Sequence, residues 1–154
     1  MVDEKSGIAI ICSEFNGEIT DRMLKSAVAR CKEAGVEVRY VCRVPGAFDM
    51  PLFIDELAAR SDVDALVTLG AIVAGDTRHD EVIAAALASG VASLSVKHGK
   101  PVALGVSGPG MSWEQGVERA EEYAARAVDS ALKMLSGLRQ LRKKDERKYP
   151  AIIG

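Results

Sequence analysis

Short apolar runs alternate along the chain with longer stretches in which apolar residues recur at helical spacing. The four apolar runs cover residues 8–12, 36–44, 65–69 and 102–106. The first and third are nearly continuous, as in strands that are buried on both faces, whereas the second alternates charged with apolar residues. We therefore expect four strands, with the second at an edge of the sheet.

Helical patterns follow each of these runs. They cover about residues 19–31, 47–60, 82–98 and 112–135. Pro51 fits the second helix only in its first turn, and a Ser-x-x-Gln capping box at Ser112 marks the start of the fourth. Strand and helix alternate throughout, which predicts right-handed crossovers between parallel strands. We predict an α/β protein with a three-layer, flavodoxin-like fold: a four-stranded parallel sheet with helices on both faces, in a single domain over residues 1–154.

Composition narrows the classes of partner. The chain has 154 residues, of which 48% are hydrophobic but only 5% aromatic, so its core must consist of aliphatic side chains. A net charge of −2 argues against nucleic acid as a partner. Residues 135–154 carry six basic and two acidic side chains, and we expect a solvated basic tail from about residue 139.

The cysteines and histidines suggest neither a disulfide framework nor a metal site. Cys12, Cys31 and Cys42 are widely spaced, which is typical of buried thiols in a reducing compartment. With only two histidines, no metal-ligand pattern is present, and we expect no metal. Residues 2–5 do not resemble a signal peptide and no apolar run reaches membrane-spanning length, so we expect a cytoplasmic protein.

The segment 75–80 (Gly-Asp-Thr-Arg-His-Asp) carries the strongest chemical signal. It lies between a buried strand and a helix, where parallel sheets bind ligands. If Thr77 caps this helix, the amides of the first turn can bind an anion such as phosphate. The helix dipole favours a neutral imidazole at His79, which could accept and return a proton. A surface histidine without a role is the alternative, and this segment alone leaves both open.

Three further loops follow the other strands. Phe15 either stacks on a flat substrate or folds back on the core. The proline- and glycine-rich segment 44–51 exposes amides beside Phe48 and Asp49, either to hold a polyol or simply as a turn with a helix cap. Gly-Pro-Gly at 108–110 predicts a rigid turn. On the helix that follows, an arginine facing the cleft would pair with phosphate.

Taken in order, these loops resemble the lumazine synthase family, over about residues 7–135. The resemblance rests on Phe-Asn at 15–16, Val-Pro-Gly-Ala-Phe-Asp-Met-Pro-Leu at 44–52, Leu-Gly-Ala-Ile-Val-Ala-Gly-Asp-Thr-Arg-His at 69–79, Pro-Val-Ala-Leu-Gly-Val at 101–106, and Glu-Gln with Glu-Arg-Ala between 114 and 120. This family condenses 5-amino-6-(D-ribitylamino)uracil with 3,4-dihydroxy-2-butanone 4-phosphate. The products are 6,7-dimethyl-8-ribityllumazine, phosphate and water, in riboflavin biosynthesis.

The resemblance implies no cofactor and no metal, and it implies a role for each matched residue. Phe15 would stack on the uracil ring, and His79 would transfer protons. Arg119 would balance the charge of the phosphate, to which Asp76 and Thr77 would offer donors. The pyrimidine and ribityl site would be lined by Ala47, Phe48, Asp49, Ala71, Ile72 and Val73.

The family also assembles as pentamers with active sites between neighbouring subunits, and in some members twelve pentamers close into an icosahedral shell. The resemblance thus implies a cytoplasmic homo-oligomer in which Leu104 and Arg119 serve a neighbour's site. Leu104 stands where phenylalanine is usual, and Asp49 replaces a longer glutamate. Asp80-Glu81 follows the histidine at a place where the family typically has an aromatic residue. Gly-Pro-Gly at 108–110 also takes the place of a threonine-rich turn. With these departures, the sequence resembles the archaeal-type branch of the family more than the common bacterial pattern.

Two other functions fit the same architecture. An archaeal riboflavin synthase is related, but it would be expected to lack the Gly-x-Thr-x-His segment that is intact at 75–79. A flavodoxin-like module that binds a flavin or lumazine without turnover would have much the same pocket, and only activity distinguishes it.

Overall fold

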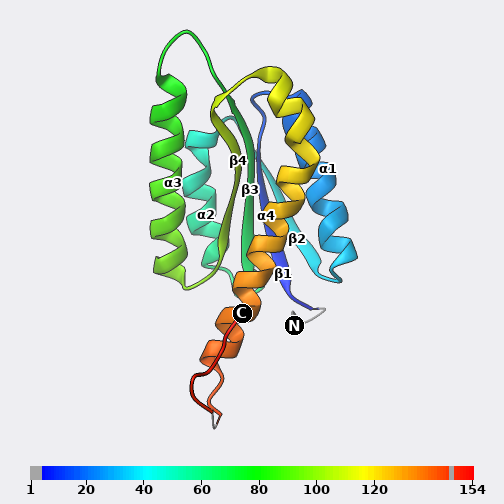
Figure 1. Ribbon diagram of the computed structural model, residues 1–154, viewed down its shortest axis with the longest axis vertical. Coiled ribbons are helices and arrows are strands. Elements are labelled where there is room, and N and C mark those ends of the chain that lie inside the picture. The colour runs from blue at the N-terminus through cyan, green and yellow to red at the C-terminus, as the bar shows by residue number, and fades with distance from the viewer. Residues whose placement is uncertain (1–4, 146–147) are drawn as a thin grey trace.

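Four parallel strands form the centre of the molecule (Figure 1). The computed structural model describes residues 5–145 and 148–154. The strands are β1 (Gly7–Ser13), β2 (Glu37–Val44), β3 (Ala65–Val73) and β4 (Val102–Met111), in the order β2-β1-β3-β4. β2 therefore lies at an edge, as predicted. The order reverses direction between β1 and β3, which creates the crevice where such sheets bind ligands.

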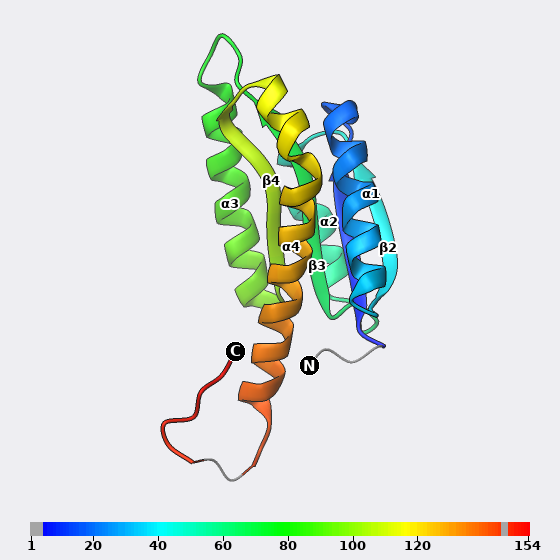
Figure 2. The same ribbon diagram turned by 45° about the vertical axis from the view of Figure 1, so that its right-hand side comes forward.

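Two helices cover each face of the sheet (Figures 1 and 2). They are α1 (Gly17–Glu33) and α4 (Trp113–Arg142) on one face, and α2 (Met50–Ala58) and α3 (His79–His98) on the other. A short 3-10 turn, η1 (Ala47–Asp49), precedes α2, so that Pro51 falls in the first turn of the helix. The predicted three-layer α/β fold is confirmed.

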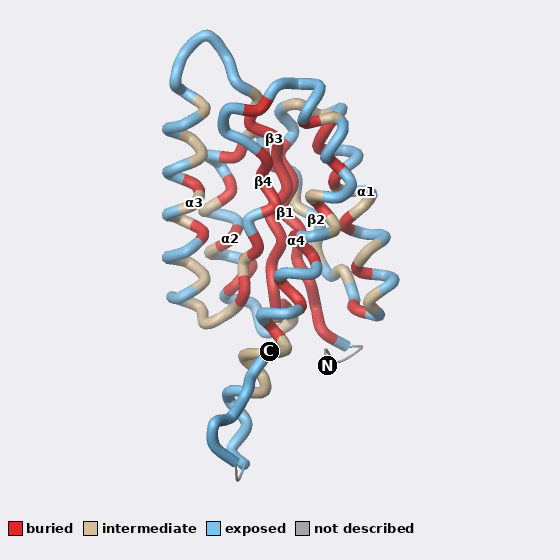
Figure 3. The backbone as a smooth tube through the Cα atoms, in the orientation of Figure 1, coloured by how far each residue is buried: buried red, intermediate tan, exposed pale blue. Residues whose placement is uncertain are grey.

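The strands supply a core to each face, because successive side chains point to opposite sides of a sheet. Ile10 faces α1 and α4, whereas its neighbour Ile11 faces α2, and both are fully buried. Figure 3 shows β1 and β3 as almost continuously buried. Small residues let α4 approach closely: a Cβ at Gly105 would lie 2.8 Å from the Cβ of Ala127. A core poor in aromatic residues is therefore filled by close approach of the backbone.

Two strands are longer than the apolar runs suggested. β3 continues through Gly70 to Val73, and β4 continues to Met111 alongside it. The segment 108–110 is thus part of β4, and the prediction of a rigid turn there is wrong. Pro109 is tolerated because β4 is an edge strand, where a missing N–H disrupts no ladder on the outer side.

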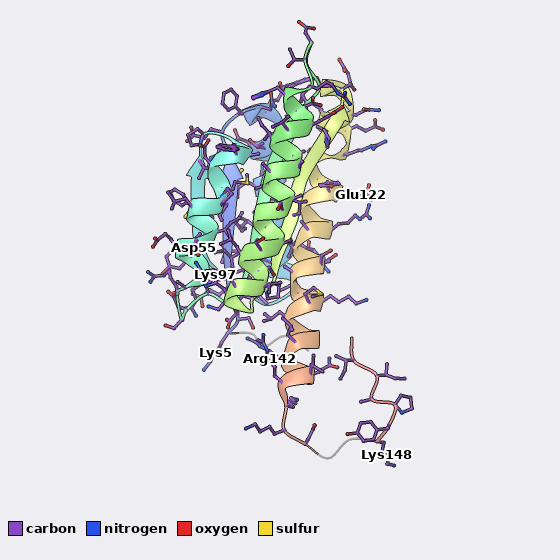
Figure 4. The ribbon with its side chains drawn as sticks, turned by 90° about the vertical axis from the view of Figure 1, so that its left-hand side faces the viewer. Lys5, Asp55, Lys97, Glu122, Arg142 and Lys148 are labelled. Carbon is purple, nitrogen blue, oxygen red and sulfur yellow. The ribbon has the colours of Figure 1, made fainter. Side chains whose placement is uncertain are left out.

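The fourth helix also runs further than predicted, to Arg142, so residues 139–142 of the expected tail are helical. Arg139 stabilises this extension, since its guanidinium donates to the Ser6 hydroxyl at 2.8 Å and lies 3.4 Å from the Asp64 carboxylate. Arg142 and Lys148 mark the end of α4 and the segment beyond it in Figure 4. Residues 1–4 and 146–147 lie outside the described residues. No helix in the described part of the chain has the length and apolar character needed to cross a membrane.

Candidate active site

A pocket of about 400 Å³ lies at the carboxyl ends of β1 and β3, in the crevice where the strand order reverses. Most of the residues predicted from sequence line it together. These are Phe15, Ala47, Phe48, Asp49, Ile72, Val73, Thr77 and His79. Three loops that are distant in sequence therefore meet around one cavity, with apolar walls and a few polar groups.

The loop after β1 presents Phe15 to the pocket. The ring is 72% exposed, so the alternative that it folds back on the core is wrong. The backbone N–H of Phe15 donates to the carbonyl of Pro45 at 3.0 Å. Asn16 is left-handed with φ 57°, and its side-chain amide donates to the carbonyl of Ala71 at 2.7 Å. These bonds hold the exposed ring in place from both neighbouring strands.

The turn after β2 forms the opposite wall of the pocket. The Asp49 carboxylate accepts the backbone N–H of Gly46 at 3.0 Å, which closes the η1 turn. A Cβ at Gly46 would lie 3.4 Å from the Phe15 ring, so the turn packs directly against that ring. Asp49 therefore stabilises the turn and lines the pocket at once, and the two interpretations of this segment do not compete.

The connection from β3 to α3 carries the polar part of the site. α3 begins at His79, later than a Thr77 cap would imply, and Arg78 is the N-cap. The Thr77 hydroxyl instead accepts the backbone N–H of His79 at a long 3.4 Å. His79 is exposed in the first turn, and Arg78 is paired with Glu81 at 3.0 Å. His79 thus lies at the positive end of the helix dipole and is open to a ligand.

Four predicted residues do not line this pocket. Ala71 is buried behind it, and its carbonyl accepts the Asn16 bond. Asp76 lies exposed in the connection before α3. Leu104 is exposed on β4, where it borders a separate groove between β4 and α3. Arg119 is exposed on α4, in the layer on the other face of the sheet. Within one chain, the structure does not bring the last two to the cavity.

The structure adds lining residues that were not predicted as site residues. They are Asn16, Gly46, Gly75, Asp80 and Ile83. Four of these five stand in or beside the loop motifs, so their nearness to those motifs could have predicted them as lining residues. Ile83 could have been found from helical spacing, because it lies one turn after His79 on α3.

The thiols lie away from this pocket and are free. Burial raises the pKa of Cys31 to about 11 and also raises the pKa of Cys12, against the opposing effect of the Arg43 charge. Cys42 is half-buried, and its pKa is raised for the same reason. Among the described residues, no cluster of His, Cys, Asp and Glu side chains could hold a metal ion.

Comparison with known proteins identifies the family of this chain. Residues 5–139 match the family profile described as 6,7-dimethyl-8-ribityllumazine synthase. The chain belongs to that family. Proteins named 6,7-dimethyl-8-ribityllumazine synthase are 47% identical in Metallosphaera sedula, over 92% of this chain and 93% of the relative, and 46% identical in Sulfolobus acidocaldarius, over 92% and 89%. The protein of that name in Saccharolobus solfataricus is 44% identical over 99% of both chains.

These relatives are archaeal lumazine synthases, in agreement with the expected archaeal-type pattern. The match to the family extends from before β1 to the last turns of α4. It therefore includes all three loops around the pocket, as well as Leu104 and Arg119. Membership of the lumazine synthase family favours the synthase over the riboflavin synthase and the binding module.

Proposed function

We propose that this protein is a transferase that condenses 5-amino-6-(D-ribitylamino)uracil with 3,4-dihydroxy-2-butanone 4-phosphate. The products are 6,7-dimethyl-8-ribityllumazine, phosphate and water, in the cytoplasmic synthesis of riboflavin. One observation carries the proposal: in a chain of this family, the exposed Phe15 ring, the η1 turn and His79 line a single pocket.

The apolar side of the pocket binds the uracil substrate. The flat pyrimidine stacks on Phe15, whose ring is already exposed and held by its backbone and by Asn16. Ala47, Phe48 and Asp49 form the wall along which the ribityl chain lies, and Ile72 and Val73 at the end of β3 form the floor. The Asp49 carboxylate accepts the backbone N–H of Gly46 and can accept ribityl hydroxyls as well.

The polar side binds the butanone phosphate near the start of α3. The Thr77 hydroxyl and backbone donors from Asp76 onwards face the phosphate. Asp80 and Glu81 make this turn acidic, and Arg78 is already paired with Glu81. A further cation is therefore needed, and we assign it to Arg119 of a neighbouring subunit.

His79 moves the protons of the reaction. The substrate amine attacks the ketone, and loss of water gives an imine; elimination of phosphate and ring closure with loss of a second water follow. Each step removes a proton from one atom and delivers one to another, which an imidazole side chain can do. Much of the acceleration comes from holding two reactants in register between Phe15 and the start of α3.

The outer surface of α3 supports assembly as homopentamers or multiples of pentamers, including a closed shell. Residues 82–96 contain no charged side chain, yet Val82 is 66% and Val96 84% exposed. Leu104 is also exposed, at the adjacent edge of the sheet. Burial against a second copy removes this apolar surface from water and carries Leu104 and Arg119 toward another subunit's pocket.

Two measurements test these proposals. Purified protein is mixed with both substrates while lumazine absorbance and phosphate release are followed. The expected result is acceleration of both signals in equal amounts, and a rate no faster than the spontaneous reaction contradicts the synthase. A protein that binds lumazine without accelerating its formation is the binding module instead. Sedimentation velocity separates pentamer, decamer and shell, and a monomer at micromolar concentration contradicts the assembly.

A further inference from the structure

Two consecutive residues of β4 hold both ends of the connection that carries His79. At one end, the Ala74 N–H donates to the carbonyl of Met111 at 2.8 Å. At the other, the Gly110 N–H donates to the Asp80 carboxylate at 3.1 Å. The connection from 74 to 80 stands out from the body of the molecule in Figure 1, so these bonds anchor it where it leaves and rejoins the fold.

The part of β4 that provides this anchor is itself closely packed on β3. Gly108 has φ +97°, and a Cβ there would lie 2.2 Å from the carbonyl oxygen of Ile72, so only glycine allows the contact. Ile72 lines the pocket. Gly110, with φ +73°, then turns its N–H toward Asp80. The position of Asp80 is therefore defined relative to the floor of the pocket.

The first turn of α3 has little else to hold it. Its first backbone bond, from Val82 N–H to the Arg78 carbonyl, is 3.4 Å long, as is the bond from the His79 N–H to Thr77. Helix ends fray where their backbone bonds are long and exposed. A contact from Asp80 to a packed strand opposes that fraying at the residue next to the histidine.

We propose that Asp80 is a positioning residue that fixes His79 over the pocket through its bond to the Gly110 N–H; this rests on the proposed function. The bond needs an acceptor oxygen at position 80 and does not need a charge. Asparagine keeps that oxygen in nearly the same place, whereas alanine removes it. This difference separates positioning from direct participation of the carboxylate, which also reaches the rim of the pocket.

The test compares Asp80→Ala, Asp80→Asn and a matched control, Glu81→Ala. The control removes the neighbouring acid of the same turn and its pair with Arg78, but leaves the Gly110 bond. Steady-state rates are measured with each substrate varied in turn. We expect Asp80→Ala to lower kcat about tenfold, less than the removal of His79 itself, because a misplaced catalytic group still acts in part. We expect KM for the uracil substrate to stay within about twofold, and Asp80→Asn and Glu81→Ala to stay close to the parent.

Three results would overturn the proposal. Equal losses in Asp80→Asn and Asp80→Ala make the carboxylate a direct participant in the reaction. A parent-like Asp80→Ala shows that the bond does not position His79. A rise in both KM values together with a fall in melting temperature reduces Asp80 to a structural residue.

A second readout does not depend on activity. Hydrogen exchange at the Gly110 amide should be faster in Asp80→Ala than in the parent and unchanged in Asp80→Asn. If the parent protein fails to accelerate the condensation, the proposed function fails, while exchange at Gly110 still reports whether Asp80 anchors the turn. If the parent is active and exchange at Gly110 is the same in all variants, only the positioning role fails.

Discussion

The two helical layers of this protein differ in how much of their apolar surface a single chain buries. α1 and α4 bury an apolar stripe against the sheet and are linked on their outer side by polar contacts, including Arg30 to Asp129 at 2.7 Å and Ser26 to the Glu121 carbonyl at 2.7 Å. α3 buries only Leu87 and Val91 while exposing Val82 and Val96. A helix that is apolar on all sides needs a second covering surface. One layer therefore stabilises the fold, and the other holds the ligand pocket and the proposed subunit interface.

A pair of valine substitutions compares the layers directly. Val128 on α4 is fully buried, whereas Val96 on α3 is 84% exposed. We expect Val128→Ala to lower the free energy of unfolding by about 2–3 kcal/mol at every protein concentration, because it removes buried methyl groups and leaves a cavity. Val96→Ala should cost less than about 0.5 kcal/mol in the dissociated chain and more as assembly sets in. Denaturant unfolding at several protein concentrations measures both effects. If the two variants lose the same free energy of unfolding at every protein concentration, α3 is not part of a subunit interface.

In the ligand-binding layer, His79→Ala should have the largest effect on activity. We expect kcat to fall about 10- to 100-fold, less than the full range for general acid–base catalysis, because holding the reactants together remains intact. Binding of the lumazine product should stay within about twofold, since Phe15 and the η1 turn are unaltered. Rapid-mixing kinetics and product titration measure the two quantities, and an unchanged kcat argues that protons move through water or substrate alone.

Local pattern was enough to predict the framework. The buried runs, the edge character of β2 and the Ser112 capping box all rest on neighbours in sequence, and the box is closed by Gln115 with bonds of 3.0 and 3.2 Å. The ends of β3 and β4 depend on distant contacts instead. Position 70 in β3 favours glycine because a Cβ there would lie 3.0 Å from Ser13 Oγ and 3.3 Å from Val106 Cγ2, and no local signal reports that crowding.

In the candidate site, too, some features could be predicted from local sequence and others depend on distant contacts. The loops could be named from their composition, but the exposure of Phe15 depends on Asn16 reaching Ala71, far along the chain. The bond between Asp80 and Gly110 likewise joins two departures from the family pattern that seemed unrelated in sequence. Leu104 and Arg119 have no place at this chain's own pocket, since the surface that would bring them to one belongs to the proposed assembly.

Arg119 links the two layers, because it lies on the framework helix α4 but is proposed to serve a neighbour's phosphate site. We expect Arg119→Ala to raise KM for the butanone phosphate about tenfold, the equivalent of one charged hydrogen bond, with KM for the uracil substrate unchanged. Arg126→Ala is the matched control, since Arg126 lies further along the same helix in an exposed pair with Glu122 at 3.8 Å. Similar KM values for both variants would place the phosphate cation elsewhere.

The smallest expected effect comes from the contact that joins the two helices of the ligand-binding layer. Asp55 on α2 accepts hydrogen bonds at 2.7 Å from Lys97 Nζ and from His98 Nε2, both on the last turn of α3. Figure 4 shows Asp55 and Lys97 side by side at this end of the helices. The hydrogen bond from Lys97, and then that from His98, lowers the pKa of Asp55.

A lowered folded-state pKa means that Asp55 stabilises the fold above its unfolded pKa of about 3.9, and that this contribution is lost as pH falls through the lower folded value. Asp55→Asn should therefore be slightly less stable than the parent at pH 7, and the difference should shrink as the pH is taken below about 4. Glu56→Gln, which removes the exposed carboxylate next to it, is the control for the loss of one negative charge. Urea unfolding of the three proteins at pH 7 and at the lowest pH where the parent remains folded measures the change. A difference between Asp55→Asn and the parent that stays constant over this range would mean that the contact acts through packing and not through charge.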